Sequence, residues 1–391
     1  MRTQIAIIGG GPAGLLLSHM LELEGIDSIV VERKSKAYVL QRIRAGVLEA
    51  GTVDLLRQVG LGERMDREGH PHNGIGIDWQ DRPRFLIDTN TFTGKSMMAY
   101  GQTAITEDLY AAREKAGGHI IDEADNVTLH DIASDAPYIT LEKGGKEHRI
   151  DCDYIAGCDG YHGVSRHAIP ASVQQTFEKI YPFGWLGIMS ETPPLPDIVY
   201  AYHERGFALA SMRNPTLSRY YIQCDLDTRI EDWPDEVFWD ELKARFPADV
   251  AAEIVTGPSI EKSIAPLRSF VSEPMRYGRL MLAGDAAHIV PPTGAKGLNL
   301  AVSDVFYLSR AFTEHYRHNR QTYLDGYSDM ALRRVWGAER LSWWLTSLLH
   351  RFPDDTPFDL RTRQNQFDHL AASKIAQAAL AEEYVGLPFE D

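Results

Sequence analysis

The chain of 391 residues contains few cysteines and no long apolar run. Its three cysteines, Cys152, Cys158 and Cys224, form no C-x-x-C pair. This spacing argues against a metal site and favours reduced thiols in a cytoplasmic protein. No stretch of about 18 apolar residues occurs, so we expect no membrane-spanning helix. The N-terminus leads directly into a predicted strand, without a basic segment and an apolar region, so we expect no secretory signal.

Positive charge is also scarce, because 40 Lys and Arg residues stand against 55 Asp and Glu, a net charge of −15. This balance argues against nucleic acid or an anionic membrane as a partner. The chain has no internal repeat and no low-complexity segment. Its 44% apolar content allows a sizeable core, and its length indicates two or three domains, or one large domain with an insertion. In so acidic a chain, a cleft that binds an anion must gather its own arginines.

The first 33 residues carry the strongest motif. The apolar run Thr3–Ile8 predicts a strand, the glycine-rich turn at 9–14 follows, Leu15–Glu24 predicts a helix, and Ser28–Glu32 predicts a second strand. A G-x-G-x-x-G turn between a strand and a helix is the dinucleotide-binding fingerprint. A glycine-rich turn without a ligand is the alternative, but turn, helix and terminal acid all agree with the fingerprint.

Each part of this motif has a physical role. Gly9 permits the tight turn, Gly11 lets the backbone approach a pyrophosphate, and Gly14 lets the helix pack closely against the strand. The free N–H groups and the dipole at the helix start favour the anion. Glu32 follows Gly14 by 18 residues and suits hydrogen bonds from a ribose 2′-hydroxyl. This favours FAD or NAD over NADP at this turn.

Three further features are ambiguous from the sequence alone. Five cations lie within twelve residues after Glu32, and they fit either a solvated surface or phosphate contacts: Arg33, Lys34, Lys36, Arg42 and Arg44. The strand Tyr154–Cys158 leads into Asp159-Gly160, which by itself is typical of an ordinary turn. His72 opens a region of short strands at 70–100, and a lone histidine is usually a surface or satisfied residue.

A second informative region is an antiparallel meander predicted for Asp197–His203, Phe207–Arg213 and Arg219–Leu226. Strand alternation gathers serine, arginine and tyrosine side chains on one face: Tyr200, Ser211, Arg213, Arg219 and Tyr221. These side chains offer many hydrogen-bond donors and few acceptors, which suits a carboxylate ligand. A solvated sheet face is the alternative.

Helical patterns cover much of the remaining chain. They are predicted for Val53–Val59, Thr103–Ala116, Phe238–Arg245, Ala248–Val255, Leu298–Phe312, Tyr323–Leu349 and Thr362–Glu383. The apolar run Arg279–Ala283 predicts a buried strand that ends in Gly284-Asp285. The glycine-punctuated loop at 291–297 then leads to Gly297-Leu298-Asn299, a second helix start that favours an anion.

Together these motifs resemble the class A FAD-dependent aromatic hydroxylases along most of the chain. The glycine turn with Glu32, then Cys158-Asp159-Gly160, then Gly284-Asp285 occur in the family's order. Longer segments carry the same resemblance: RIRAGVLE from Arg42, DYIAGCDGYHG from Asp153, YPFGWLG from Tyr181, SRYY from Ser218, SIAPLRSF from Ser263, GDAAHIVPPTGAKGLNLA from Gly284 and YVGLP from Tyr384.

The resemblance implies a mixed α/β (α+β) fold and a homodimer. A Rossmann-like FAD-binding domain would occupy residues 1–175, with 71–100 contributing strands to the substrate side. A substrate domain built on an antiparallel sheet would occupy 176–289. A flavin-contacting loop and a helical C-terminal and interface region would occupy 290–391.

The resemblance also assigns residues to the two cofactors, FAD and NADPH. Asp285 would bind the ribityl chain, the loop at 294–299 would hold the pyrimidine edge of the flavin, and Arg219 would support the flavin in alternative positions. The implied FAD contacts are Gly9, Gly11, Gly14, Glu32, Arg42, Arg44, Gln102, Asp159, Arg219, Asp285, Gly294, Lys296, Gly297, Leu298 and Asn299. The implied NADPH contacts are Arg33, Tyr38, Arg42, Arg44, His162 and Arg268. Lys34 departs from the glutamine of NADPH-preferring members, but it keeps a cation near a 2′-phosphate, so we still expect NADPH over NADH.

The activity implied by the resemblance is hydroxylation of 4-hydroxybenzoate to 3,4-dihydroxybenzoate with dioxygen, through a flavin hydroperoxide. Ser211, Arg213 and Tyr221 would bind the carboxylate, and Pro292 would lie beside the ring through its carbonyl. Tyr200 would bond the phenol and Tyr384 would bond Tyr200, in a proton relay towards His72. The alternatives are hydroxylation of another ring acid, such as 3-hydroxybenzoate or an aminobenzoate, and a non-enzymatic FAD-binding redox sensor.

Overall fold

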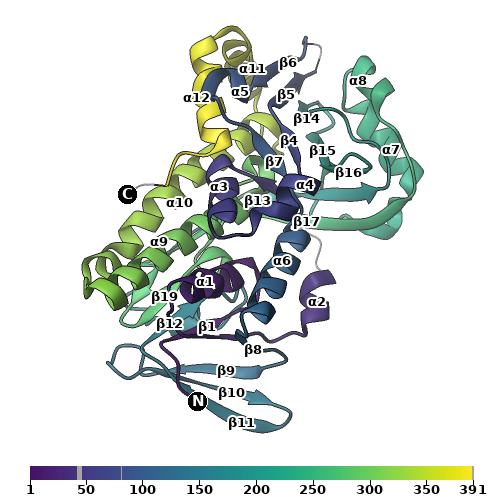
Figure 1. Ribbon diagram of the computed structural model, residues 1–391. Coiled ribbons are helices and arrows are strands. Elements are labelled where there is room, and N and C mark those ends of the chain that lie inside the picture. The colour runs from purple at the N-terminus through teal and green to yellow at the C-terminus, as the bar shows by residue number, and fades with distance from the viewer. Residues whose placement is uncertain (42–45, 81, 390–391) are drawn as a thin grey trace.

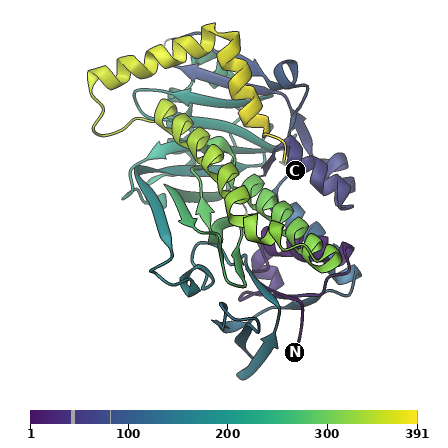
Figure 2. The same cartoon turned by 90° about the vertical axis from the view of Figure 1, so that its left-hand side faces the viewer.

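The computed structural model describes residues 1–41, 46–80 and 82–389, and Figure 1 shows two main sheets joined by long helices. In this part of the chain, no helix is both long and apolar enough to span a bilayer. Figure 2 shows the C-terminal helices, in yellow, at the end of the molecule far from the N-terminus. The mixed α/β fold expected from the sequence is confirmed.

The first sheet has six strands in the order β18-β19-β12-β1-β2-β8. Its central strand β1 (Ile5–Ile8) runs parallel to β2 (Ser28–Val31) and to β12 (Tyr154–Gly157). Its outer strands are β8 (His119–Ile121), β19 (Leu280–Leu282) and β18 (Arg276–Tyr277). Because β1 is buried on both faces, it is apolar throughout, as parallel sheets require.

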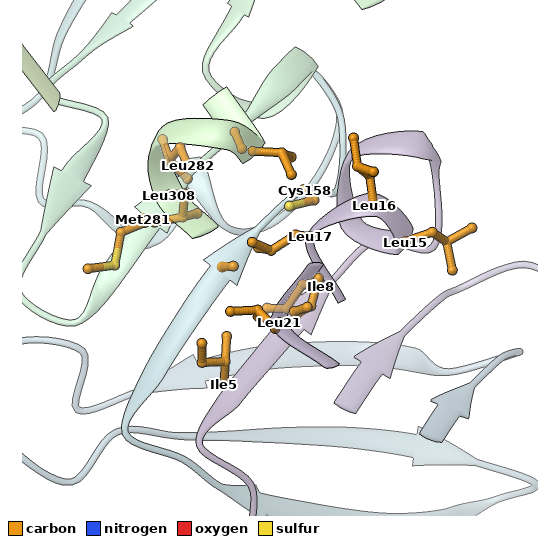
Figure 3. Close-up of a cluster of buried hydrophobic side chains, with 14 of the residues drawn as sticks. Ile5, Ile8, Leu15, Leu16, Leu17, Leu21, Cys158, Met281, Leu282 and Leu308 are labelled. Carbon is orange, nitrogen blue, oxygen red and sulfur yellow. The ribbon is translucent and has the colours of Figure 1, made fainter. Parts of the chain in front are cut away.

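Three helices pack beside this sheet: α1 (Pro12–Leu23), α6 (Gln102–Lys115) and α9 (Gly297–His318). Figure 3 shows Leu17 and Leu21 of α1 beside Ile5 and Ile8 of β1, in a cluster that also includes Leu308 of α9. Burial of this cluster fixes the start of α1 at the carboxyl end of β1, where the glycine turn lies.

The second sheet has eight strands in the order β20-β17-β13-β16-β15-β14-β5-β6. The predicted meander is confirmed as β14 (Ile198–Tyr202), β15 (Ala208–Asn214) and β16 (Leu217–Cys224), which pair antiparallel. β5 (Gly74–Trp79) joins it parallel to β14, with β6 (Phe85–Asp88) at the edge. β20 (His288–Ile289) forms the other edge.

The two longest strands, β13 (Gln175–Ser190) and β17 (Ser259–Glu273), form an antiparallel ribbon that the sequence patterns did not predict. Residues 175–180, at the start of β13, are all exposed. They show no regular alternation of apolar and polar residues that would predict a strand. The remaining strands form two three-stranded sheets: β9 (Asp125–His130), β10 (Tyr138–Lys143) and β11 (Lys146–Asp151), and β3 (Val47–Leu48), β7 (Met97–Ala99) and β4 (His70–His72).

The helical predictions are correct in place and differ at the ends. The other helices are α2 (Lys36–Gln41), α3 (Ala50–Gln58), α4 (Gly62–Glu68), α5 (Thr89–Thr93), α7 (Asp235–Ala244), α8 (Ala248–Glu253), α10 (Thr322–Leu349), α11 (Pro357–Ala372) and α12 (Lys374–Val385). The single helix predicted for Thr362–Glu383 is wrong, because Ser373 separates α11 from α12. The Ser373 hydroxyl caps α12 by accepting a hydrogen bond from the Ala376 N–H. The domain boundaries stay a prediction.

Candidate active site

The glycine turn is closely packed on one side and open on the other. Gly9 has φ of +110°, and a Cβ there would lie 2.2 Å from the Cys158 carbonyl oxygen. A Cβ on Gly14 would lie 2.0 Å from the Gly9 carbonyl oxygen. A Cβ on Gly11, however, would meet nothing within 4 Å, and no side chain caps the start of α1. The turn therefore leaves backbone N–H groups and free space at Gly11, which fits a pyrophosphate.

Glu32 lies beside this turn, at the end of β2. One carboxylate oxygen accepts a hydrogen bond from the Gly10 N–H at 2.7 Å, and the other accepts from the Lys34 N–H at 2.7 Å. Both bonds hold the carboxylate in place, and each oxygen keeps a further lone pair for a ribose hydroxyl.

Two aspartates follow the other strands of the first sheet. Asp159, after β12, accepts hydrogen bonds from the Ser165 N–H and hydroxyl at 2.9 and 3.0 Å, and burial raises the pKa of its carboxyl. These contacts indicate that Asp159 shapes its own loop. Asp285 is exposed and follows Gly284 after β19. The Gly284 N–H is held by the buried Asp304 at 2.8 Å, so the turn that presents Asp285 is fixed.

The loop at 294–299 turns its polar side chains into the protein. Asn299 makes four hydrogen bonds, accepting from the Glu49 N–H and the Thr52 hydroxyl and donating to the carbonyls of Val47 and Ala295. The buried Lys296 ammonium binds Glu49 at 2.6 Å. Leu298 packs against the apolar core of the first sheet. The loop can therefore offer a flavin its backbone from Gly297 onward, where α9 begins without a side-chain cap.

The meander brings the predicted carboxylate-binding residues together. Tyr200, Leu209 and Tyr221 are direct neighbours across β14, β15 and β16, so their side chains share one face. Ser211 lies two residues further along β15 on the same face, and its hydroxyl donates to the Arg219 carbonyl at 2.8 Å. The shared face predicted from alternation is confirmed for Tyr200, Ser211, Arg219 and Tyr221.

Arg213 follows on β15 at a β-bulge between Met212 and Asn214, and it has no carboxylate partner among the described residues. Its Nε is buried without a hydrogen-bond partner, and one terminal nitrogen donates to the Met212 carbonyl at 3.2 Å. Burial lowers the pKa of the guanidinium. Burial acts to raise the pKa of the Tyr221 phenol, but the charges of Arg213 and Arg219 outweigh it, so that pKa lies below its usual value. A carboxylate would balance this local positive charge.

Arg219 is already paired, unlike Arg213. Its guanidinium forms an ion pair with Glu261 and donates to the Ser263 hydroxyl at 3.0 Å. It also lies over the Tyr221 ring, 4.9 Å from the ring centre. Arg219 therefore links β16 to β17 at the edge of the site.

The Tyr200 and Tyr384 hydroxyls are joined by a buried hydrogen bond of 2.8 Å. Their rings are nearly perpendicular, at 89°. Burial raises the pKa of Tyr200 well above 10 and that of Tyr384 to about 12. Both phenols are therefore protonated at neutral pH, and the donor in the pair can reverse without charge separation.

No direct hydrogen bond extends this relay from Tyr384 to His72. His72 is buried, and neither ring nitrogen has a partner among the described residues. Burial lowers its pKa to about 4, so the ring is neutral at pH 7. No hydrogen bond joins His72 to Tyr384, and the relay to His72 stays a prediction.

Pro292 is exposed, and its carbonyl accepts from the Ala295 N–H at 2.9 Å.

The residues assigned to NADPH fall into two groups. Arg33 and Tyr38 are exposed around the start of α2. His162 stands edge-on to Tyr161, 5.0 Å between ring centres, and Arg268 lies over the same ring at 4.7 Å while pairing with Glu178. No hydrogen bond or ion pair among the described residues joins the two groups. Arg42 and Arg44 lie outside the described residues. Gln102 begins α6 and binds the Thr106 hydroxyl through its carbonyl.

Two residues of this region were missed by the sequence analysis. Glu49 is a buried acid that binds both Lys296 and Arg334. Arg166 is buried and donates to the carbonyls of Ala286 and Tyr161, which ties the loop after β12 to the turn after β19. Both partners of Glu49, and the Ala286 partner of Arg166, are far away in sequence, so no local spacing signals these contacts.

The parallel sheet and the open glycine turn fit a dinucleotide-binding protein, and comparison with known proteins identifies a flavoprotein. A family model described as "FAD binding domain" matches residues 2–342, and the chain belongs to this family. FAD is therefore the cofactor, as predicted.

Within the family, the chain is similar to p-hydroxybenzoate hydroxylase of Acinetobacter baylyi, with 53% identity over 100% of this chain and 96% of that protein. It is 25% identical to a rifampicin monooxygenase of Streptomyces venezuelae over 86% of this chain and 67% of that protein. Among solved structures, p-nitrophenol 4-monooxygenase of Pseudomonas putida has a TM-score of 0.83 at 16% identity, covering 97% of each chain. This last likeness concerns the fold alone.

Proposed function

We propose that this protein hydroxylates 4-hydroxybenzoate to 3,4-dihydroxybenzoate with NADPH and dioxygen, in the breakdown of aromatic compounds. The observation that carries the proposal is one sheet face with an unpaired arginine, Arg213, at one position and the buried Tyr200–Tyr384 hydroxyl pair at another. A ring with a carboxylate at one end and a phenol at the other matches both. The 53% identity to a p-hydroxybenzoate hydroxylase supports the same substrate.

The carboxylate end of the substrate is bound by Arg213, Ser211 and Tyr221. The Arg213 guanidinium supplies charge-assisted hydrogen bonds, and the Tyr221 hydroxyl adds a donor. The Ser211 hydroxyl completes the donor set when it turns from the Arg219 carbonyl to the substrate. Because Arg213 has no carboxylate partner in the described part of the chain, binding breaks no ion pair seen there. The substrate carboxylate takes the place of the missing counter-charge.

The phenol end is bound by Tyr200. When the phenol proton passes to the Tyr200 oxygen, the Tyr200 proton passes to Tyr384, and Tyr384 releases its own proton outward, so that both tyrosines end the step neutral. The substrate ring becomes a phenolate and gains electron density next to its oxygen. Tyr200 and Tyr384 are therefore catalytic residues in this proposal, and His72 is the predicted exit for the proton.

Bound FAD, reduced by NADPH, supplies the oxygen-activating chemistry. The chain holds it through the glycine turn, Glu32 and the loop at 294–299. The tyrosine pair lies in an apolar cluster between the larger sheet and the C-terminal helices, with Phe207, Leu380 and Trp185 among its members. This cluster keeps water from the reacting ring, which favours hydroxylation over loss of reducing power to peroxide.

Two further parts of the proposal concern the setting of the enzyme. We propose a homodimer, as the resemblance implies. We also propose a cytoplasmic location, because all three cysteines are free and buried.

The test is NADPH consumption in air by the purified protein, with and without 4-hydroxybenzoate, with 3,4-dihydroxybenzoate and peroxide assayed together. Strong stimulation with nearly one product per NADPH is expected. Stimulation that yields peroxide but little product would favour another ring acid as the true substrate. Slow oxidation that no ring acid stimulates would favour the redox-sensor alternative.

A further inference from the structure

The C-terminal segment that follows Tyr384 is held by one arginine of α10. This residue is Arg334, whose guanidinium is partly buried. One of its nitrogens donates to the carbonyls of Leu387 and Pro388 at 2.8 and 3.4 Å. The other nitrogen binds the Glu49 carboxylate at 2.7 Å. Arg334 therefore joins the chain end to a buried acid 285 positions away from it in sequence.

Glu49 carries this connection to Tyr384 itself. Its second oxygen binds the Lys296 ammonium at 2.6 Å, and Lys296 in turn donates to the carbonyls of Glu383 and Tyr384 at 2.7 and 2.9 Å. These carbonyls lie in the last turn of α12, where two cations offset the negative end of the helix dipole. Arg334, Glu49 and Lys296 thus form one buried network around the end of α12.

The backbone of the segment also fits closely against this network. Gly386 has φ of +91°, and a Cβ there would lie 2.1 Å from a Glu49 carboxylate oxygen. Beyond it, Phe389 packs on Phe306 with 4.8 Å between ring centres, and the Arg334 guanidinium lies 5.0 Å from the Phe389 ring centre. Residues 386–389 are therefore attached both through their backbone and through an aromatic ring.

We propose that Arg334 is a positioning residue for the proton relay. It holds residues 386–389 and orients Glu49, so that Lys296 fixes the end of α12 and keeps the Tyr384 hydroxyl within hydrogen-bond reach of Tyr200. Arg334 touches neither the tyrosine hydroxyls nor any residue of the carboxylate site, so its effect on the proton relay passes through Glu49 and Lys296 to Tyr384. This inference rests on the proposed function.

The central variant is Arg334→Met, which removes the charge and the fork of donors but keeps an apolar stem. We expect product formation per unit time to fall about tenfold, the equivalent of one charge-assisted hydrogen bond. Binding of 4-hydroxybenzoate and of FAD should change less than twofold. Arg334→Lys, which keeps one cation for Glu49 but not the fork, should recover part of the rate.

A matched control lies six residues further along the same helix. Arg340 pairs with the Glu383 side chain at 2.8 Å on the surface and does not reach the buried network. Arg340→Gln should keep the wild-type rate. A second variant, Gly386→Ala, leaves every charge in place but pushes the segment away from Glu49, and it should reproduce the loss seen with Arg334→Met.

A double-mutant cycle separates positioning from general destabilisation. In a Tyr384→Phe background, Arg334→Met should have no further effect on the rate, because the group that it positions is gone. An equal loss in both backgrounds, or a wild-type rate in Arg334→Met, would overturn the inference.

Amide hydrogen exchange gives a readout that does not depend on activity. Exchange at residues 380–386 should be at least about fivefold faster in Arg334→Met than in Arg340→Gln, while the glycine turn is unchanged. If the wild type forms no 3,4-dihydroxybenzoate, the proposed function fails. Unchanged exchange at 380–386 would then refute the positioning role separately.

Discussion

Arg213→Met is expected to weaken substrate binding and to stabilise the ligand-free protein. The Arg213 guanidinium is largely buried, burial lowers its pKa, and it pairs with no carboxylate of residues 1–41, 46–80 and 82–389. Two charge-assisted hydrogen bonds to a carboxylate are together worth about 3 kcal/mol, so the Kd for 4-hydroxybenzoate should rise about 100-fold. Removal of an unpaired, poorly solvated charge should raise the free energy of unfolding by about 1 kcal/mol, or Tm by about 2 °C.

The matched variant is Arg219→Met, in which the sign of the stability change reverses. Arg219 is paired, so its removal leaves Glu261 without its cation and should lower Tm. Binding is measured by titration calorimetry and Tm by scanning calorimetry without substrate. The reasoning is wrong if Arg213→Met lowers Tm as much as Arg219→Met does, or if its Kd changes less than threefold.

Four further outcomes are expected. Tyr200→Phe should retain FAD and substrate binding but lose hydroxylation, and an unchanged product yield per NADPH would contradict the relay. Gly11→Val should reduce FAD content with little change in Tm of the apoprotein, whereas Gly14→Ala should lower both, because only the second Cβ meets backbone, at 2.0 Å. Lys34→Glu should lower kcat/KM for NADPH more than for NADH, because it places a like charge near the 2′-phosphate, and a clear NADH preference in the wild type would refute the proposed donor. The pKa of His72 is about 4 in the folded protein and 6.5 in the unfolded chain, so the unfolded chain binds more protons between these pH values. About 3 kcal/mol of the free energy of unfolding is therefore lost as the pH falls from 6.5 to 4. Urea titrations of His72→Gln should show a smaller loss.

The parts of the molecule that were predicted correctly are local in sequence. The glycine turn with Glu32 is complete within the first 33 residues, and its strand, turn and helix each have a signature of their own. The meander was predictable because β14, β15 and β16 follow one another through short turns, and alternation fixes which side chains share a face. Ser211 and Arg213 were found in this way, before any resemblance was used.

The parts that local patterns could not reveal depend on distant partners. β13 pairs with β17 some 80 residues later, and its exposed half has no apolar pattern. The Tyr200–Tyr384 bond joins residues 184 positions apart and was expected only from the resemblance. Lys296 was assigned to the flavin, yet its ammonium binds Glu49 and two carbonyls of the chain end. Such pairs form only when the tertiary fold brings the elements together.

The arrangement of the larger sheet has a consequence for how such enzymes change specificity. The ribbon of β13 and β17 and the start of α9 make up the frame, whereas the ring-facing groups alternate along β14, β15 and β16 with core residues on the opposite face. A substitution at Leu209 or Ser211 can therefore alter the shape of the proposed ligand space without disturbing the apolar cluster on the opposite face of the sheet, which includes Val199, Ala208 and Ile222. Selection for a new aromatic acid can act on a few alternate codons while the machinery for flavin binding is inherited intact.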